Sequence, residues 1–309
     1  MKAIIRQKAL DLGFCAAGFA AVRTRHAALQ SLSEMVAEGR NGEMRYLESG
    51  MSERKDPSLL LNGVRTVLCV AIAGPARLNQ DNMMEGALSA HATVPDYHRV
   101  VRTLLQELLE FIRAEAGVPV NGLVCVDGAP VLEKAWAEAA GIGRTGKNTL
   151  LIVPGAGSMV FLGELLLDIG IEPDEPLESD PCGDCRACLD ACPTGALTAP
   201  GRIDATRCIS YLTIELKREF TPEEASMTAP WIFGCDRCME ACPHNQSRSA
   251  DPHPAFAPSE ALRNLTASSV LELTGSTFRK LFAGTPVTRL GLRRLKRNAM
   301  AVQERKDKR

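Results

Sequence analysis

The stretch CGDCRACLDACP, residues 182–193, decides how this part of the chain folds, and the shorter run CDRCMEACP, residues 235–243, repeats its pattern. The first run has the spacing C-x2-C-x2-C-x3-C-P. Three thiolates spaced in this way wrap one 4Fe–4S cube, and the fourth, before proline, serves a second cube. We therefore expect two 4Fe–4S clusters, which move single electrons at low potential in a reducing compartment.

The second run lacks one cysteine of the full pattern, and Cys208 is the remaining cysteine nearby. Because the fourth cysteine of each run binds the other cluster, the sequence predicts two groups of four ligands. One group is Cys182, Cys185, Cys188 and Cys242; the other is Cys192, Cys208, Cys235 and Cys238. Structural zinc is the alternative, but eight cysteines with two Cys-Pro endings fit zinc poorly. The remaining three, Cys15, Cys69 and Cys125, lie in apolar runs and are expected in the core.

The compartment follows from the cysteines and from the N-terminus. Eleven cysteines in a chain of 309 residues, most of them in tight clusters, favour a metal site over a disulfide scaffold. The apolar part of the first 23 residues is broken by Arg6, Gln7, Lys8 and Asp11, which favours an amphipathic helix over a signal peptide. No apolar run reaches 18 residues. We expect a cytoplasmic protein without a membrane span.

The chain divides into three predicted parts. Residues 1–176 alternate strand-like runs (64–72, 123–126, 149–153 and 159–167) with helical patterns (97–116 and 130–140), which indicates an α/β or α+β domain. An acidic linker with prolines, 173–181, leads into the cysteine-bearing module, 177–253, which we expect to be ferredoxin-like. Residues 254–309 form a short helical segment with one turn at 284–286.

The net charge of −1 hides an asymmetry. Residues 279–309 hold eleven Lys or Arg against Glu304 and Asp307. A basic tail on an acidic body suggests a polyanion as partner, above all a nucleic acid. A solvated terminal helix without a ligand is the alternative that charge alone leaves open.

Several stretches besides the two cysteine runs are distinctive: Tyr46-Leu47, Asp56-Pro57-Ser-Leu-Leu-Leu61, Asp96-Tyr97-His98, Val126-Asp127, Pro130-Val-Leu-Glu-Lys-Ala-Trp136, Gly146-Lys147-Asn148-Thr149, Phe161-Leu-Gly-Glu164 and Cys208-Ile-Ser-Tyr-Leu-Thr-Ile-Glu-Leu-Lys217. Through these stretches the whole chain resembles the epoxyqueuosine reductases, cobalamin-dependent enzymes that complete queuosine biosynthesis on tRNA. The resemblance covers residues from about 40 to 300.

This resemblance implies a base-off cobalamin between the α/β domain and the cluster module, with an external low-potential electron donor. A reduced corrinoid is a nucleophile suited to opening an epoxide, and the resulting alkoxide needs a proton. Asp127 matches the family's proton donor, and we expect burial to raise its pKa and keep it protonated. The alternative role for Asp127 is a helix N-cap ahead of Pro130.

Other site residues follow from the same resemblance. Residues that match cobalamin contacts are Tyr97, His98, Lys147, Asn148, Thr149, Ser158 and Ser210; for Tyr97 and His98, a structural role at a helix start is the alternative. Residues that match the surface bordering the tRNA anticodon loop are Lys217, Arg289, Arg293, Arg294, Lys296 and Arg297. The chain departs from the family pattern at 91–95 and at Arg144, where an aromatic residue is usual.

Three functions remain open at this point. The first is reduction of epoxyqueuosine in tRNA by a monomeric enzyme. The second is a related corrinoid iron–sulfur reductase that acts on another substrate, as the reductive dehalogenases do. The third is an electron-transfer or corrinoid-reducing protein without a substrate pocket.

Overall fold

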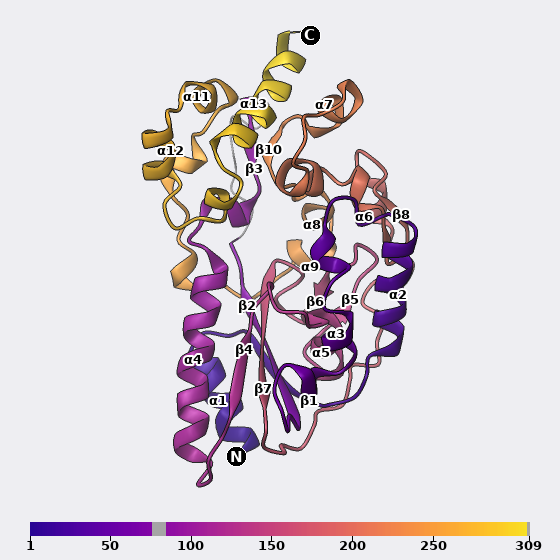
Figure 1. Ribbon diagram of the computed structural model, residues 1–309, viewed down its shortest axis with the longest axis vertical. Coiled ribbons are helices and arrows are strands. Elements are labelled where there is room, and N and C mark those ends of the chain that lie inside the picture. Colours follow the sequence, from indigo (N-terminus) through magenta and orange to yellow (C-terminus); the bar gives the residue numbers. More distant parts are fainter. Residues whose placement is uncertain (76–84, 308–309) are drawn as a thin grey trace.

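The computed structural model describes residues 1–75 and 85–307 (Figure 1). Its central sheet has four strands in the order β1-β2-β7-β4, with bounds Ala16–Ala21, Thr66–Ala73, Val160–Leu167 and Gly122–Cys125. All three neighbouring pairs run antiparallel. The mixed α and β class expected from the sequence is confirmed. The antiparallel pairing corresponds to α+β rather than to a doubly wound parallel sheet.

The predicted strands lie within one or two residues of the observed ones. The runs at 64–72, 123–126 and 159–167 become β2, β4 and β7. All eight residues of β2 are buried, because β1 and β7 flank this strand and helices cover both of its faces. That burial explains the continuous apolar run in the sequence. The run at 149–153 is reduced to β6, Leu151–Ile152, which pairs with β5, Arg144–Thr145.

Helices pack on both faces of the sheet. On one face, α1 (Lys2–Asp11) and α4 (Tyr97–Glu115) enclose a core that contains Phe19, Leu105 and Leu108 (Figure 1). On the other face, α5 (Glu133–Ala139) buries Trp136 against β1 and β2. Since α4 carries its leucines and valines at helical spacing, the helix predicted at 97–116 is confirmed.

The N-terminal prediction is only partly correct. A helix forms over Lys2–Asp11, but the chain then turns at Gly13 and continues as β1. The turn needs glycine, because φ at Gly13 is 90°. The small apolar residues of Ala16–Ala21 suit a strand that is buried in the sheet rather than one turn after another of an amphipathic helix.

The two cysteine runs adopt the same local structure. Each forms a four-residue helix, α6 (Ala187–Asp190) or α8 (Arg237–Glu240), followed by a Cys-Pro step. These two helices contact each other, which brings the runs together although about 50 residues separate them in the sequence. Around them lie the hairpin of β8 (Leu197–Ala199) and β9 (Arg202–Ile203), the π-helical turn η6 (Tyr211–Glu215) and α9 (Pro243–Gln246).

The C-terminal segment is helical, as predicted, but more interrupted. It contains α10 (Glu260–Arg263), α11 (Ala267–Glu272), α12 (Gly275–Leu281) and α13 (Leu292–Asp307), with short 3-10 turns η7 (Pro254–Phe256) and η8 (Pro286–Arg289). These helices pack on β10 (Trp231–Phe233), which pairs in parallel with β3 (Ala87–Leu88). One core therefore joins residues from all three parts of the sequence, including Leu88, Ile232, Phe282 and Leu295.

Several further elements complete the described part of the fold. They are α2 (His26–Ala37), η1 (Arg45–Leu47), α3 (Met51–Lys55), η2 (Pro57–Leu59), η4 (Ala90–Thr93), η5 (Ala205–Arg207) and α7 (Pro222–Thr228). Among the described residues, no helix combines the length and the apolar character that a membrane crossing needs.

Candidate active site

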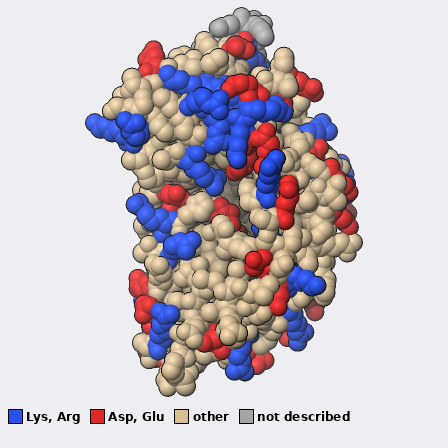
Figure 2. All heavy atoms as spheres, in the orientation of Figure 1, with Lys and Arg blue, Asp and Glu red and all other residues tan. Residues whose placement is uncertain are grey.

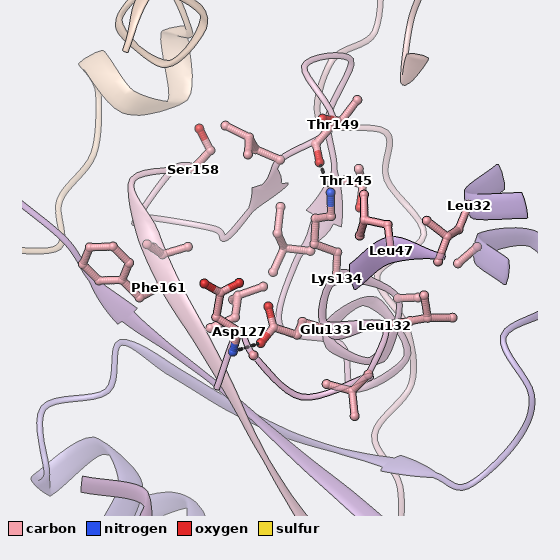
Figure 3. Close-up of a pocket in the computed structure, with 18 of the residues that line it drawn as sticks. Leu32, Leu47, Asp127, Leu132, Glu133, Lys134, Thr145, Thr149, Ser158 and Phe161 are labelled. Carbon is pink, nitrogen blue, oxygen red and sulfur yellow. Dashed lines mark hydrogen bonds between the residues drawn. The ribbon is translucent and has the colours of Figure 1, made fainter. Parts of the chain in front are cut away.

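A cavity of about 1150 Å³ lies between the sheet domain and the cysteine-bearing region. Its wall combines residues from both regions and from the C-terminal segment: His91, Tyr97, His98, Asp127, Glu133, Lys134, Thr149, Ser158, Asp236, Met239 and Arg289. Figure 3 shows part of this wall, with Asp127, Glu133 and Lys134 near one another, Phe161 to the left of Asp127 and Ser158 above it. Of the residues predicted from the sequence, the structure brings Tyr97, His98, Asp127, Thr149 and Ser158 together here.

Asp127 lies two residues after the end of β4, on the loop that leads to α5. Its φ of 53° is in the left-handed region, which aspartate adopts more readily than most residues. Its Oδ2 accepts a hydrogen bond from the Tyr97 hydroxyl at 2.6 Å and lies 2.8 Å from Nε2 of His98. Its backbone N–H donates to Oε1 of Glu133 at 2.6 Å. Asp127 is not the N-cap of α5, because that helix begins at Glu133.

The expectation that burial raises the pKa of Asp127 is wrong. The hydrogen bond with His98 lowers the pKa of Asp127 more than burial raises it, and Tyr97 lowers it further. The same contact, together with Asp96, raises the pKa of His98 to about 9. At neutral pH the proton therefore resides on the imidazole, and Asp127 is a carboxylate.

The start of α4 positions this pair. Asp96 is the N-cap of α4: its Oδ1 accepts from the backbone N–H of His98 at 3.0 Å and lies 2.7 Å from Nδ1 of His98. The ring of Tyr97 stacks on Phe161 of β7, with centroids 4.3 Å apart and planes 2° apart. Helix capping and ring stacking thus hold Tyr97 and His98 with their polar atoms toward Asp127.

In the turn formed by residues 146–149, Lys147 faces the first cysteine run and Asn148 faces the interior, so neither lines the cavity. The ammonium group of Lys147 donates to the carbonyls of Gly183 and Cys185, and its backbone N–H lies 3.4 Å from Sγ of Cys182. Asn148 is buried, and its side chain accepts from the N–H of Leu150. Lys147 therefore holds the first cysteine loop in place.

Thr149 differs from its two neighbours because it does line the cavity. It adopts a φ of 68°, and its carbonyl accepts from Nζ of Lys134 at 2.6 Å. Figure 3 shows this bond across the top of α5. Within this turn, Lys147 contacts the first cysteine run and Thr149 lines the cavity, so the turn connects the two.

Ser158 joins the cavity wall to the second cysteine run. Its backbone N–H donates to Oδ1 of Asn245 at 2.6 Å, and its hydroxyl accepts from Nδ2 of Asn245 at 3.0 Å. The same amide donates to the carbonyl of Met239 at 2.7 Å. Since Met239 also lines the cavity, Asn245 couples the Cys-Pro-x-Asn sequence to the cavity.

The electrostatic neighbours of the cysteine thiols fall into the two predicted groups. The thiol of Cys242 has Cys182 and Cys185 as neighbours, and that of Cys188 has Cys182 and Cys242. In the second group, Cys208 neighbours Cys192, Cys235 neighbours Cys208 and Cys238, and Cys238 neighbours Cys192 and Cys208. The thiol of Cys238 also has Cys188 of the first group as an electrostatic neighbour, so the two groups are adjacent.

Ser210 lies beside the second group rather than in the cavity wall. It is the N-cap of η6, and its hydroxyl hydrogen-bonds to the thiol of Cys208. Within the described residues, no three His, Cys, Asp or Glu side chains approach closely enough to hold one metal ion. A 4Fe–4S cube does not require such an approach, since each of its thiolates binds a different iron.

The predicted tRNA-facing residues differ in their surroundings. The side chains of Arg289 and Arg293 are 62% and 74% exposed and form ion pairs with Glu215 and Glu219, at 3.5 and 3.1 Å. Figure 2 shows basic side chains gathered over the upper part of this face, where α13 and α7 lie, above a hollow near its middle. Lys217 and part of Lys296 are also accessible.

Two arginines of the same set are engaged in packing. Arg297 is buried, and its guanidinium group donates to the carbonyls of Leu212 and Leu216 at 3.0 and 2.9 Å. Arg294 donates to the carbonyl of Ile214 at 2.9 Å. In this conformation Arg297 fastens α13 to η6 and presents no charge at the surface.

Comparisons with known proteins give two family matches. Residues 54–128 match the profile described as epoxyqueuosine reductase QueG, DUF1730, and residues 181–245 match the 4Fe-4S double cluster binding domain. Over 296 residues the chain is 37% identical to the epoxyqueuosine reductase of Cellulophaga algicola, which covers 96% of this chain and 95% of that protein. The chain belongs to the epoxyqueuosine reductase family.

Solved structures of epoxyqueuosine reductases share the fold. One contains a tRNA-Tyr epoxyqueuosine-modified tRNA stem loop; it has a TM-score of 0.89 and 30% identity, and the match covers 97% of this chain and 80% of the other. Another, from Bacillus subtilis, has its aspartate catalytic loop swung out of the active site, with the same TM-score, identity and coverage.

Several residues at or near the cavity are not evident from the sequence. Glu133 and Lys134 line the cavity and lie within a stretch that carries the family resemblance, but nothing in the sequence distinguishes their charged side chains as site residues. Asn245 stands in the Cys-Pro-x-Asn signature and could have been found there. Arg144, where the family usually has an aromatic residue, donates to the carbonyl of Leu177 in the linker, at 2.8 Å.

Proposed function

We propose that this chain reduces epoxyqueuosine to queuosine in tRNA, as the members of its family do. One observation carries the proposal: Tyr97, His98 and Asp127 form a proton-holding group in a large cavity beside two sets of four cysteines. Epoxide reduction needs a proton source and an electron source at one place, and this arrangement supplies both.

The eight cysteines fit two 4Fe–4S clusters with the partition given above, and bound clusters would supply electrons one at a time. Asp236 and Met239, which flank Cys235 and Cys238, line the cavity, whereas Cys185 is exposed to solvent. We therefore place the second group next to the substrate and the first group next to an external low-potential donor.

The cavity fits a bound cobalamin in size and in lining. Its volume exceeds the 300–1,000 Å³ of ordinary ligand pockets, and its wall combines apolar side chains with Tyr97, His98, Thr149 and Ser158. When bound, cobalamin would supply a strongly nucleophilic, reducible metal centre. The contacts of Lys147, Asn148 and Ser210 suit them to hold the surrounding loops rather than the cofactor itself.

Residues of the chain would then hold and donate the proton that the opened epoxide needs. His98 holds a proton between two carboxylates, and Asp127 is the neighbour that faces the cavity. A proton passed from His98 through Oδ2 of Asp127, or from the Tyr97 hydroxyl, would neutralise the oxygen released from the epoxide. This role as a conduit replaces that of an aspartate protonated in the resting state.

We further propose that the exposed members of the basic set guide the tRNA. Arg289 lies both in the cavity wall and in a second, smaller pocket with Asp96 and His98, so it connects the basic surface with the proton-holding group. Contacts to phosphates there would be salt-dependent and independent of sequence. We place this reaction in the cytoplasm and propose that the enzyme is a monomer. Its domain boundaries would lie near residues 176 and 253.

Anaerobic reconstitution tests the proposal. The chain would be loaded with iron, sulfide and cobalamin, reduced, and incubated with tRNA that contains epoxyqueuosine, followed by nucleoside analysis. Queuosine should form only when both cofactors and a reductant are present. Absence of queuosine from a protein with full cluster and cobalamin content would refute the proposal, and an identical reaction without cobalamin is the control.

A further inference from the structure

A carboxyl group without a partner lies inside the sheet beneath the cavity. Glu164 is in the middle of β7, its exposure is 0%, and neither oxygen has a hydrogen-bond partner within the described residues. Its neighbours across the sheet are Cys69 of β2 and Cys125 of β4, whose thiols burial keeps neutral. An ionised carboxylate in this place would be very unfavourable, so Glu164 carries a proton.

Glu133 lies between this buried group and the cavity. It is the first residue of α5, lines the cavity, and accepts the backbone N–H of Asp127 (Figure 3). Glu164 and Asp127 are both its electrostatic neighbours, and burial raises the pKa of Glu133 to about 7. The three carboxyl groups thus lead from the sealed interior to the proton-holding pair.

Few charges oppose these carboxyl groups. The titratable and charged groups that face Glu133 and Glu164 from the packed elements are Tyr97, His98, Asp127, Lys134, Cys69 and Cys125, with Arg25 and Arg102 beyond the two thiols. Lys134 is itself engaged with the carbonyl of Thr149, and burial lowers its pKa. No ion pair among the described residues neutralises Glu133 or Glu164, and this favours their protonated forms.

The chemistry of the proposed function requires two protons. Removing the epoxide oxygen breaks both of its carbon–oxygen bonds, forms a carbon–carbon double bond and releases water. It consumes two electrons, which come singly from an external one-electron donor through the clusters, and two protons. The pair of His98 and Asp127 holds one proton, and burial raises the pKa of the Tyr97 hydroxyl, so a more acidic group is better suited to supply the second proton.

We propose that Glu133 and Glu164 form a proton reserve that supplies this second proton. Glu133 faces the cavity and gives up its proton toward Asp127, while Glu164 is a positioning residue that stays protonated, so that the pair carries at most one negative charge. This inference rests on the proposed function for its use, although the two protonated carboxyl groups exist without substrate.

Infrared spectroscopy of the cluster-loaded full chain tests the reserve without tRNA. We expect the carbonyl stretch of a protonated carboxylic acid that disappears as pH rises through about 7, and a second that persists. E133Q should remove the titrating band, and E164Q the persistent one. E110Q, at an exposed glutamate of α4, should keep both. A wild-type spectrum without a titrating band, or one unchanged in E133Q, would overturn the inference.

Turnover gives the second measurement. In E133Q we expect kcat to fall by about tenfold to a hundredfold, with a smaller loss at acidic pH and a constant KM for tRNA. In E164Q, which exchanges one neutral group for another, we expect a smaller change. E133Q is the safer variant to fold, because its side chain borders the cavity. If the wild type makes queuosine and both variants keep its pH profile, only the reserve fails; if the wild type makes none, the proposed function fails and the infrared result still decides the reserve.

Discussion

Nε2 of His98 lies 2.8 Å from Oδ2 of Asp127, and Nδ1 of the same ring lies 2.7 Å from Oδ1 of Asp96. One imidazole is therefore held between two carboxylates, one at the start of α4 and the other on the loop after β4. Since this arrangement raises the pKa of His98 to about 9 and lowers that of Asp127, it determines which group holds the proton before the reaction begins.

Asp127→Asn should abolish most turnover without affecting the clusters. The amide keeps the shape but cannot carry a proton between His98 and the cavity, so we expect kcat to fall by about 10²- to 10⁴-fold. Iron content, visible absorption and queuosine formation are to be measured on the same preparation. Asp11→Asn, at an exposed residue of α1, is the matched control. Wild-type activity in Asp127→Asn would dismiss this role.

The pH dependence of stability should depend on His98. A raised pKa means that the stabilisation is fully present below the unfolded value of 6.5 and is lost as pH rises through about 9. Because the pKa values of Asp96 and Asp127 are lowered, the same stabilisation is also lost when pH falls below about 3.8, the ordinary value of an aspartate.

Between these limits, His98→Gln should lower the free energy of unfolding by on the order of 1–2 kcal/mol, which allows for solvent screening at a half-exposed carboxylate. Denaturant unfolding at pH 6 and pH 9.5 measures the difference. An equal loss at both pH values would show that the imidazole contributes packing alone.

Site features that depend on neighbouring residues in the sequence could be predicted, whereas features that depend on distant residues could not. The cysteine spacing is a local signal, and from it the sequence predicts the two ligand groups that the thiol neighbours in the structure support. The ionisation of Asp127 depends on His98, 29 residues away in the sequence, and no spacing rule brings these two together. Burial alone was visible from the apolar run before Asp127, so the predicted direction of its pKa shift was wrong.

Lys147 and Arg297 illustrate the same limit. Each is a cation in a stretch that matches the family, and charge alone suggests a phosphate partner for both. In the fold, backbone carbonyls that lie far away in the sequence accept their hydrogen bonds. Strands β2 and β7, in contrast, could be predicted to within two residues because burial leaves a continuous apolar run, whereas β1 was not predicted.

The partition of the ligands can be tested with single cysteine variants. Cys242→Ser should remove one cluster and leave about four of about eight irons per chain, because the other group keeps all its thiolates. Cys238→Ser should lose the other cluster to the same extent. Cys15→Ala, outside both groups, should retain all the iron. A loss of iron from Cys15→Ala, or none from Cys242→Ser, would contradict the assignment.

Asn245→Ala should loosen the contact between the second cysteine run and the cavity wall. It removes hydrogen bonds to Ser158 and to the carbonyl of Met239, and leaves the buried N–H of Ser158 without its acceptor. We expect a loss of about 2–3 kcal/mol in the free energy of unfolding. Gln246→Ala, next to it on α9 and exposed, should cost less than about 0.5 kcal/mol. Similar unfolding curves for the two variants would argue against the bridge.

Two arginines of α13 should separate tRNA binding from stability. Arg293 is exposed and pairs only with Glu219 among the described charges, so Arg293→Ala should leave unfolding unchanged, weaken tRNA binding and reduce its salt slope by about one. Arg297 is buried, with carbonyl partners on η6, so Arg297→Ala should cost about 2–4 kcal/mol of stability. Urea unfolding and tRNA titrations at several salt concentrations measure both effects. If Arg293→Ala binds tRNA with an unchanged salt slope, phosphate contact at this surface is excluded, whatever Arg297→Ala does to folding.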